Sequence, residues 1–115
     1  MSGAGILAFD DFLKVDVRVG TVVEAGPNAA ARKPSYRLLV DFGPEIGRKT
    51  SSAQLVQNYR AEELVGRQVA AVVNFPPRQI AKVVSEVLVL GFPDAEGNVV
   101  LVGVDRRVPD GGRLY

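Results

Sequence analysis

The most constraining feature of the sequence is a long alternating stretch near its start. Between residues 15 and 25, every odd-numbered position holds Val, Thr or Ala, while charged residues and a glycine occupy most even-numbered positions. Alternation with a period of two is typical of a β-strand with one buried face. A glycine inside such a strand indicates a bulge or a sharp bend. We therefore expect a long strand at 15–25 that bends at Gly20 and curls around a small barrel.

The rest of the chain also favours a sheet. Valine occurs 20 times, against 10 leucines and 3 isoleucines, and β-branched residues pack well on pleated surfaces. Ser51 and Gln54 match the capping box that begins a helix, and Gly66 stands where such a helix would end. We predict a helical turn at 9–13 capped by an Asp, strands at 36–42, 46–50, 67–75, 85–90 and 99–104, and a helix at 54–65 with Leu55 and Tyr59 on its core face.

Three strands, one helix and further strands are the element order of an all-β OB-fold, a five-stranded Greek-key barrel with its helix between strands three and four. We expect one domain over residues 1–115, with a core at about 10–113. The strand at 99–104 and the two chain ends lie outside the minimal five-stranded barrel. We expect these N- and C-terminal additions to make a homodimer, with apolar candidates at Ile6, Leu7, Phe9 and Phe12.

The residue types present favour binding over catalysis. The 115 residues include no cysteine and no histidine, which excludes thiolate chemistry, histidine general bases and most transition-metal sites. The adjacent acids at 10–11 and 62–63 fit helical turns, and Gly43–Gly47 lacks the Lys-Ser/Thr of a phosphate loop. We expect no enzyme activity, no metal and no cofactor. No apolar run is long enough to span a membrane, so we expect no membrane insertion and a cytoplasmic protein.

Positive charge gathers in the middle of the chain. Residues 14–82 hold eleven basic and six acidic residues, although the whole chain has a net charge of only +1. This charge either is dispersed over a solvated surface or forms a face that attracts phosphates. The nucleic-acid candidates around strands two and three are Arg32, Lys33, Arg37, Arg48 and Lys49. Exposed aromatic rings on which bases could stack are scarce, because Tyr36 and Phe42 share the phase of core residues. The kind of RNA binding that remains possible is recognition of a folded RNA by its shape and phosphates.

The segment 74–78, Asn-Phe-Pro-Pro-Arg, is the most unusual in the chain. Two prolines fix an extended backbone and remove two hydrogen-bond donors, so they end a strand. The segment either is only a strand terminator or forms a rigid rim that offers the amide of Asn74 and the guanidinium of Arg78 beside Phe75.

Four blocks of sequence resemble the CsaA branch of the tRNA-binding-domain OB family. They are FDDFLKVDVRVGTVVEA at 9–25, SSAQL at 51–55, AVVNFPPRQIA at 71–81 and SEVLVLG at 85–91. The resemblance implies a homodimeric, chaperone-like protein of protein export. Such a protein binds unfolded or precursor polypeptides and the translocation ATPase of the secretion pathway. Because the chain lacks a phosphate loop, we expect it to act without ATP.

The resemblance also implies site residues. Relatives that bind the outside of tRNA use basic residues, an asparagine and a Ser-x-x-Met segment at the barrel mouth. Asn74 matches that asparagine, Ser85 matches the serine, and Leu88 stands in place of the methionine. We therefore expect polypeptides to contact Asn74, Phe75, Arg78, Ser85 and Leu88. The alternative is tRNA binding through the five basic residues together with Asn74, Arg78 and Ser85.

Overall fold

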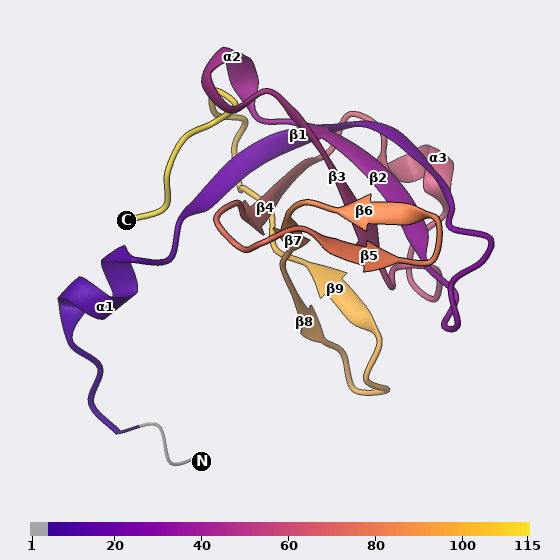
Figure 1. Cartoon of the computed structure of the whole chain (residues 1–115), viewed down its shortest axis with the longest axis horizontal. Coiled ribbons are helices and arrows are strands. Elements are labelled where there is room, and N and C mark those ends of the chain that lie inside the picture. The colour runs from indigo at the N-terminus through magenta and orange to yellow at the C-terminus, as the bar shows by residue number, and fades with distance from the viewer. Residues whose placement is uncertain (1–4) are drawn as a thin grey trace.

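Five antiparallel strands form one sheet in the order β3-β2-β1-β4-β7, which curls into a nearly closed barrel (Figure 1). The structure is a computed structural model that describes residues 5–115. Where β3 approaches the segment before β7, the N–H of Glu86 donates to the carbonyl oxygen of Thr50 at 2.8 Å. The elements are α1 (Phe9–Leu13), β1 (Val17–Pro27), β2 (Tyr36–Asp41), α2 (Gly43–Ile46), β3 (Arg48–Ala53), α3 (Ala61–Leu64), β4 (Gln68–Val72), β5 (Arg78–Ile80), β6 (Val83–Ser85), β7 (Leu88–Val89), β8 (Gly91–Pro93) and β9 (Val99–Leu101).

Strand β1 organises the barrel because it pairs with two neighbours. Its first half pairs with β4 and its second half with β2, and Thr21 belongs to both ladders. The predicted long strand is confirmed, but the bulge lies between Val22 and Glu24 rather than at Gly20. Gly20 serves close packing instead. A Cβ there would lie 2.7 Å from Cδ1 of the Phe42 ring.

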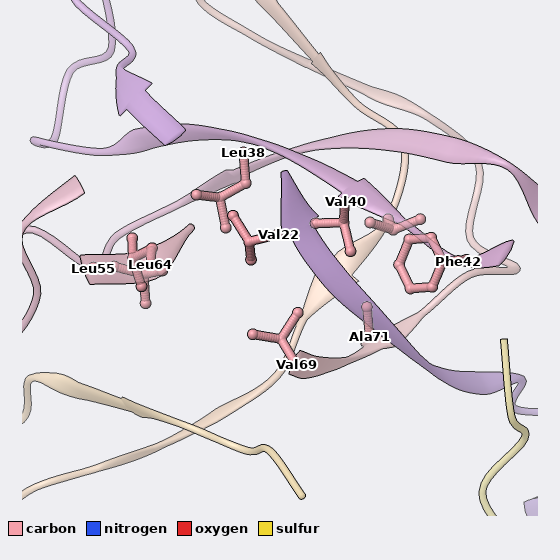
Figure 2. Packing of buried hydrophobic residues seen from close by; sticks show 9 residues of the cluster. Val22, Leu38, Val40, Phe42, Leu55, Leu64, Val69 and Ala71 are labelled. Atoms are coloured by element: carbon pink, nitrogen blue, oxygen red, sulfur yellow. The ribbon is translucent and has the colours of Figure 1, made fainter. Parts of the chain in front are cut away.

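The core lies inside the curl of the sheet, where buried apolar side chains of β1, β2 and β4 meet those of Phe42, Leu55 and Leu64 (Figure 2). Leu38, Val40 and Phe42 follow the inward phase of the β2 segment and are at most 1% exposed. Tyr36 is partly buried against the same cluster. The prediction that Tyr36 and Phe42 belong to the core is confirmed.

The predicted helix at 54–65 is mostly wrong. Ser51 is part of β3 and pairs with Leu38, so it cannot cap a helix. Sheet pairing with β2 therefore overrides the local capping signal. One turn remains at its start, in which the N–H of Tyr59 donates to the carbonyl oxygen of Leu55 at 3.0 Å. The helix between strands three and four is the short α3, which ends before Gly66 as expected.

Several other boundaries differ from the predictions. Gly43–Ile46 forms a helical turn, so the third strand runs from Arg48 to Ala53 instead of 46–50. The predicted strand at 67–75 ends at Val72. The segment 78–85 folds into the β5–β6 hairpin, and the strands predicted at 85–90 and 99–104 shorten to β7 and β9, with β8 pairing to β9. The turn at 9–13 exists, but Ala8 and not an Asp precedes it.

Two segments lie outside the barrel. The C-terminal segment crosses β1 and β4, where the side-chain amide of Gln68 donates to the carbonyl oxygen of Val108 at 2.7 Å. The hydroxyl of Thr21 donates to Asp110 Oδ1 at 2.8 Å. At the other end, α1 stands away from the barrel (Figure 1). Within residues 5–115, no helix has the length and apolar character needed to cross a bilayer.

Candidate binding grooves

Two grooves flank the β5–β6 hairpin, and most of the predicted site residues line one or the other. The first, here called the apolar groove, has a volume of about 420 Å³. Its lining includes Phe75 and Leu88, which are 53% and 50% exposed. Large apolar side chains that stay half exposed around a hollow indicate a surface that can bind another apolar group. The full lining is Ser52, Phe75, Pro76, Arg78, Ile80, Ser85, Glu86, Val87 and Leu88.

The rim of the apolar groove is held in place by hydrogen bonds to β3. The hydroxyl of Ser85 accepts the N–H of Ser52 at 3.0 Å. The carboxylate of Glu86 accepts the N–H of Thr50 at 3.0 Å. That hydrogen bond lowers the pKa of Glu86 from its ordinary value, so the carboxylate is charged at neutral pH. Ser85 and Glu86 thus attach the segment before β7 to the edge of β3, which gives the groove a preformed wall.

Asn74 is the one predicted polypeptide-site residue that does not line the apolar groove. Its Nδ2 donates to the carbonyl oxygen of Lys14 at 2.7 Å, and its Oδ1 accepts the N–H of Asp16 at 3.0 Å. The neighbouring N–H of Val73 donates to the carbonyl oxygen of Asp16 at 2.9 Å. The side chain of Asn74 therefore joins the segment that connects α1 to β1 with the end of β4. Its place in a ligand site stays a prediction.

The second groove, here called the basic groove, lies between the β1–β2 loop and the β5–β6 hairpin and has a volume of about 820 Å³. It brings together three predicted cations from distant parts of the chain, namely Arg32, Lys33 and Arg78. Within residues 5–115, none of the three forms an ion pair. Three cations around one hollow attract an anion more strongly than dispersed charges do. The remaining lining is Ala30, Ala31, Ser35, Gln54, Gln79, Ile80 and Ala81.

The other basic candidates do not join this groove. Arg37 lies 3.5 Å from Glu24, and Arg48 lies 3.7 Å from Asp41. Arg48 and Lys49 pair with Asp41 and Val40, at the end of the β2–β3 ladder opposite the β1–β2 loop. Of the six basic residues predicted to bind nucleic acid, three therefore line the basic groove, and Arg37, Arg48 and Lys49 lie outside it.

Sequence reasoning missed the hairpin that separates the grooves. This β5–β6 hairpin places Ile80 in the lining of both grooves. Its turn contains Ala81, the one non-glycine residue with positive φ (55°) among residues 5–115. The hairpin turn contains neither Asn nor Gly, which are the usual signals of a tight turn. The near symmetry of Ile80 and Val83 around Ala81 and Lys82 is the one pattern that could have indicated it.

The chain is similar to known proteins in sequence and in structure. A family model described as a putative tRNA binding domain matches residues 17–113. The methionine–tRNA ligase of Porphyromonas gingivalis is 37% identical over 108 residues, which cover 94% of this chain. The match spans 15% of that ligase, so the chain corresponds to a small part of its length.

Solved structures extend the similarity to whole chains. The structure of the chaperone CsaA from Bacillus anthracis superposes with a TM-score of 0.88 at 47% identity, covering 96% of this chain and all of that one. The CsaA chaperone protein from Picrophilus torridus gives a TM-score of 0.87 at 44% identity, again with 96% and 100% coverage. The predicted OB barrel and the resemblance to the CsaA branch are confirmed.

Proposed function

This chain belongs to the tRNA-binding-domain family, and we propose that within this family it is a CsaA-like chaperone that binds unfolded or precursor polypeptides without catalysing a reaction. The observation that carries the proposal is the apolar groove, which leaves Phe75 and Leu88 half exposed beside the cation of Arg78. An apolar side chain of an extended polypeptide would fill this hollow. The likeness to CsaA chaperones along their full length supports the same function.

The proposed mechanism is passive. Burial of apolar side chains supplies the affinity, at about 25 cal/mol per Å² removed from water. The preformed wall at Ser85 and Glu86 lowers the cost of ordering the groove. From the resemblance, the place of action is the cytoplasm, where the chaperone delivers polypeptides to the translocation ATPase. ATP has no role in this mechanism.

Two copies of the chain would present two apolar grooves. We propose a homodimer, because Ile6, Leu7 and Phe9 are strongly exposed on a segment that stands away from its own barrel. A third hollow, of about 300 Å³, offers Val17, Leu114 and other apolar side chains beside β1 and the C-terminal segment. Two linked weak sites gain affinity on one extended polypeptide by raising its effective concentration.

Sedimentation velocity tests the dimer. The wild-type chain should sediment as a dimer, and a variant with Ile6→Ser and Leu7→Ser should shift towards the monomer. Val84→Ser changes an exposed apolar residue of β6, away from this segment, and serves as the control. A wild-type monomer at micromolar concentration would contradict the dimer.

Substitutions in the apolar groove test polypeptide binding. Phe75→Ala and Leu88→Ala should each weaken the binding of a labelled unfolded polypeptide about tenfold, since a buried anchor residue contributes 1–2 kcal/mol or more. Phe92→Ala removes an exposed aromatic ring from β8, outside both grooves, and should leave affinity unchanged. Equal affinities of all three variants and the wild type would contradict the site.

The alternative function is tRNA binding, which the basic groove and the family model favour. Contacts of Arg32, Lys33 and Arg78 with phosphates would release counterions, so the logarithm of affinity should fall with the logarithm of salt concentration at a slope of about −2 to −3. Polypeptide binding in the apolar groove should be much less sensitive to salt. A flat salt response of tRNA binding would contradict this alternative.

A further inference from the structure

The β5–β6 hairpin is a wall that the two grooves share. Arg78 and Ile80 line the basic groove on one side and the apolar groove on the other. Arg78 is the only cation of the apolar groove among the described residues, whereas the basic groove also has Arg32 and Lys33. One guanidinium thus stands between a site for anions and a site for apolar chains.

The shared wall is fixed to the loop and to the barrel. The side-chain amide of Asn28, at the start of the β1–β2 loop, donates to the carbonyl oxygen of Ile80 at 3.0 Å and to Ser52 Oγ at 3.2 Å. Asn28 is buried, and its own N–H donates to the carbonyl oxygen of Ser35 at 2.9 Å. The loop, the hairpin and β3 are therefore joined at one point. This limits how far the grooves can separate to hold two ligands at once.

A phosphate chain in the basic groove would take Arg78 away from the apolar groove. An arginine that binds phosphate makes short, charge-assisted hydrogen bonds and keeps a fixed orientation. A phosphate ligand contacted by Arg32 and Lys33 would draw the guanidinium of Arg78 to their side. The rim of the apolar groove would then lose its cation, and the surface of Ile80 would be partly covered.

We propose that a phosphate chain bound in the basic groove and a polypeptide bound in the apolar groove weaken each other's binding through Arg78. This inference rests on the proposed function, because it concerns the same polypeptide site. It makes phosphate ligands, whether an RNA backbone or a free polyphosphate, negative regulators of polypeptide binding. Coupling is reciprocal, so a bound polypeptide weakens phosphate binding by the same factor.

The test measures polypeptide affinity in the presence of a small phosphate chain. The anisotropy of a labelled, uncharged, unfolded peptide is followed with the full-length protein at constant ionic strength while tripolyphosphate is added. Tripolyphosphate is short enough to occupy the basic groove without covering the apolar one, whereas a molecule as large as tRNA could cover both. We expect saturating tripolyphosphate to raise the Kd of the peptide about fivefold or more, within the usual range of coupling between two sites.

Variants separate this mechanism from general charge effects. A double variant with Arg32→Ala and Lys33→Ala should bind the peptide as the wild type does, but should need about tenfold more tripolyphosphate to release it. Arg106→Ala removes an exposed cation that lines neither groove and should behave as the wild type. A Kd for the peptide that stays constant while calorimetry records bound tripolyphosphate would overturn the proposal.

Two further results would also overturn it. Release of the peptide by tRNA but not by bound tripolyphosphate would show that bulk, and not Arg78, causes the release. Tripolyphosphate that fails to bind would remove the basic groove as a phosphate site. In both cases the peptide still binds in the absence of phosphate and the proposed function stands. Failure of the peptide to bind the wild type at all would instead contradict the proposed function itself.

Discussion

Replacement of Asn74 by alanine tests whether this residue serves the ligand or the fold. The substitution removes two hydrogen bonds, from Nδ2 to the carbonyl oxygen of Lys14 and from the N–H of Asp16 to Oδ1. Each is worth about 0.5–1.5 kcal/mol, and the site is exposed to water, so we expect a loss of about 1–2 kcal/mol. At the size of this chain, that loss lowers Tm by about 4–8 °C.

Urea unfolding at fixed protein concentration measures the loss, because a dimer would make the midpoint depend on concentration. Limited proteolysis should also cut faster near residues 13–16 in Asn74→Ala, since the segment before β1 loses its attachment to Asn74. Polypeptide and tRNA affinities should stay within about twofold of the wild type. Arg78→Ala provides the reciprocal control, with stability kept and affinity lost. Unchanged stability with reduced affinity in Asn74→Ala would refute this reasoning and place Asn74 in the ligand site.

Four further substitutions test the packing and the closure of the barrel. The hydroxyl of Ser51 is buried without a hydrogen-bond partner among the described residues, so Ser51→Ala should leave the free energy of unfolding unchanged or raise it. Ser85→Ala should lower the free energy of unfolding by about 1 kcal/mol in the same urea titration, because it removes a hydrogen bond to β3. A large loss of stability in Ser51→Ala would contradict the absence of a partner for its hydroxyl. Gly20→Ala should cost about 1–3 kcal/mol, because its Cβ would lie 2.7 Å from Phe42 Cδ1 and from Val40 Cγ1, and a thermal scan with an unchanged midpoint would be inconsistent with that contact. The hydrogen bond from Thr50 lowers the folded-state pKa of Glu86, so its contribution to stability is complete above the unfolded value of about 4.3 and is lost as pH falls through the folded pKa. Glu86→Gln should therefore flatten the fall of unfolding free energy between about pH 5 and pH 3, and a slope equal to that of the wild type would count against this role.

The sequence predicts the barrel because local pattern and tertiary structure agree along most of the chain. The alternation in β1 predicts a strand, although both of its faces are covered: Gly20 and Val22 face the barrel core, and Thr21 is buried beside the C-terminal segment. The apolar run of β4 likewise matches a strand covered on both sides, since the C-terminal segment crosses it. The failure at 54–65 has the opposite cause. Ser51 and Gln54 form a good local helix signal, but the ladder between β2 and β3 buries Ser51 in the barrel. A local sequence pattern does not indicate that a residue will pair with a strand from another part of the chain.

The candidate site could be predicted only in part from the sequence. Phe75 and Arg78 belong to the unusual segment at 74–78, and Leu88 comes from the family resemblance; the structure places all three on one groove. The grouping of Arg32 and Lys33 with Arg78 depends on the hairpin at 78–85, which has no turn signature in the sequence. The engagement of Asn74 with Lys14 joins residues 60 positions apart. Only the folded chain brings these pairs together.

Chemical-shift mapping by NMR with an unfolded apolar peptide tests most directly whether the apolar groove is the polypeptide site. At 115 residues, the amide spectrum can be assigned for the monomer or for a dimer. We expect the largest shifts at Phe75, Ile80 and Leu88, and small shifts at Arg48 and Lys49 at the far end of β3. Shifts confined to Arg32, Lys33 and the rest of the β1–β2 loop, or no shifts at saturating peptide, would contradict the proposed function.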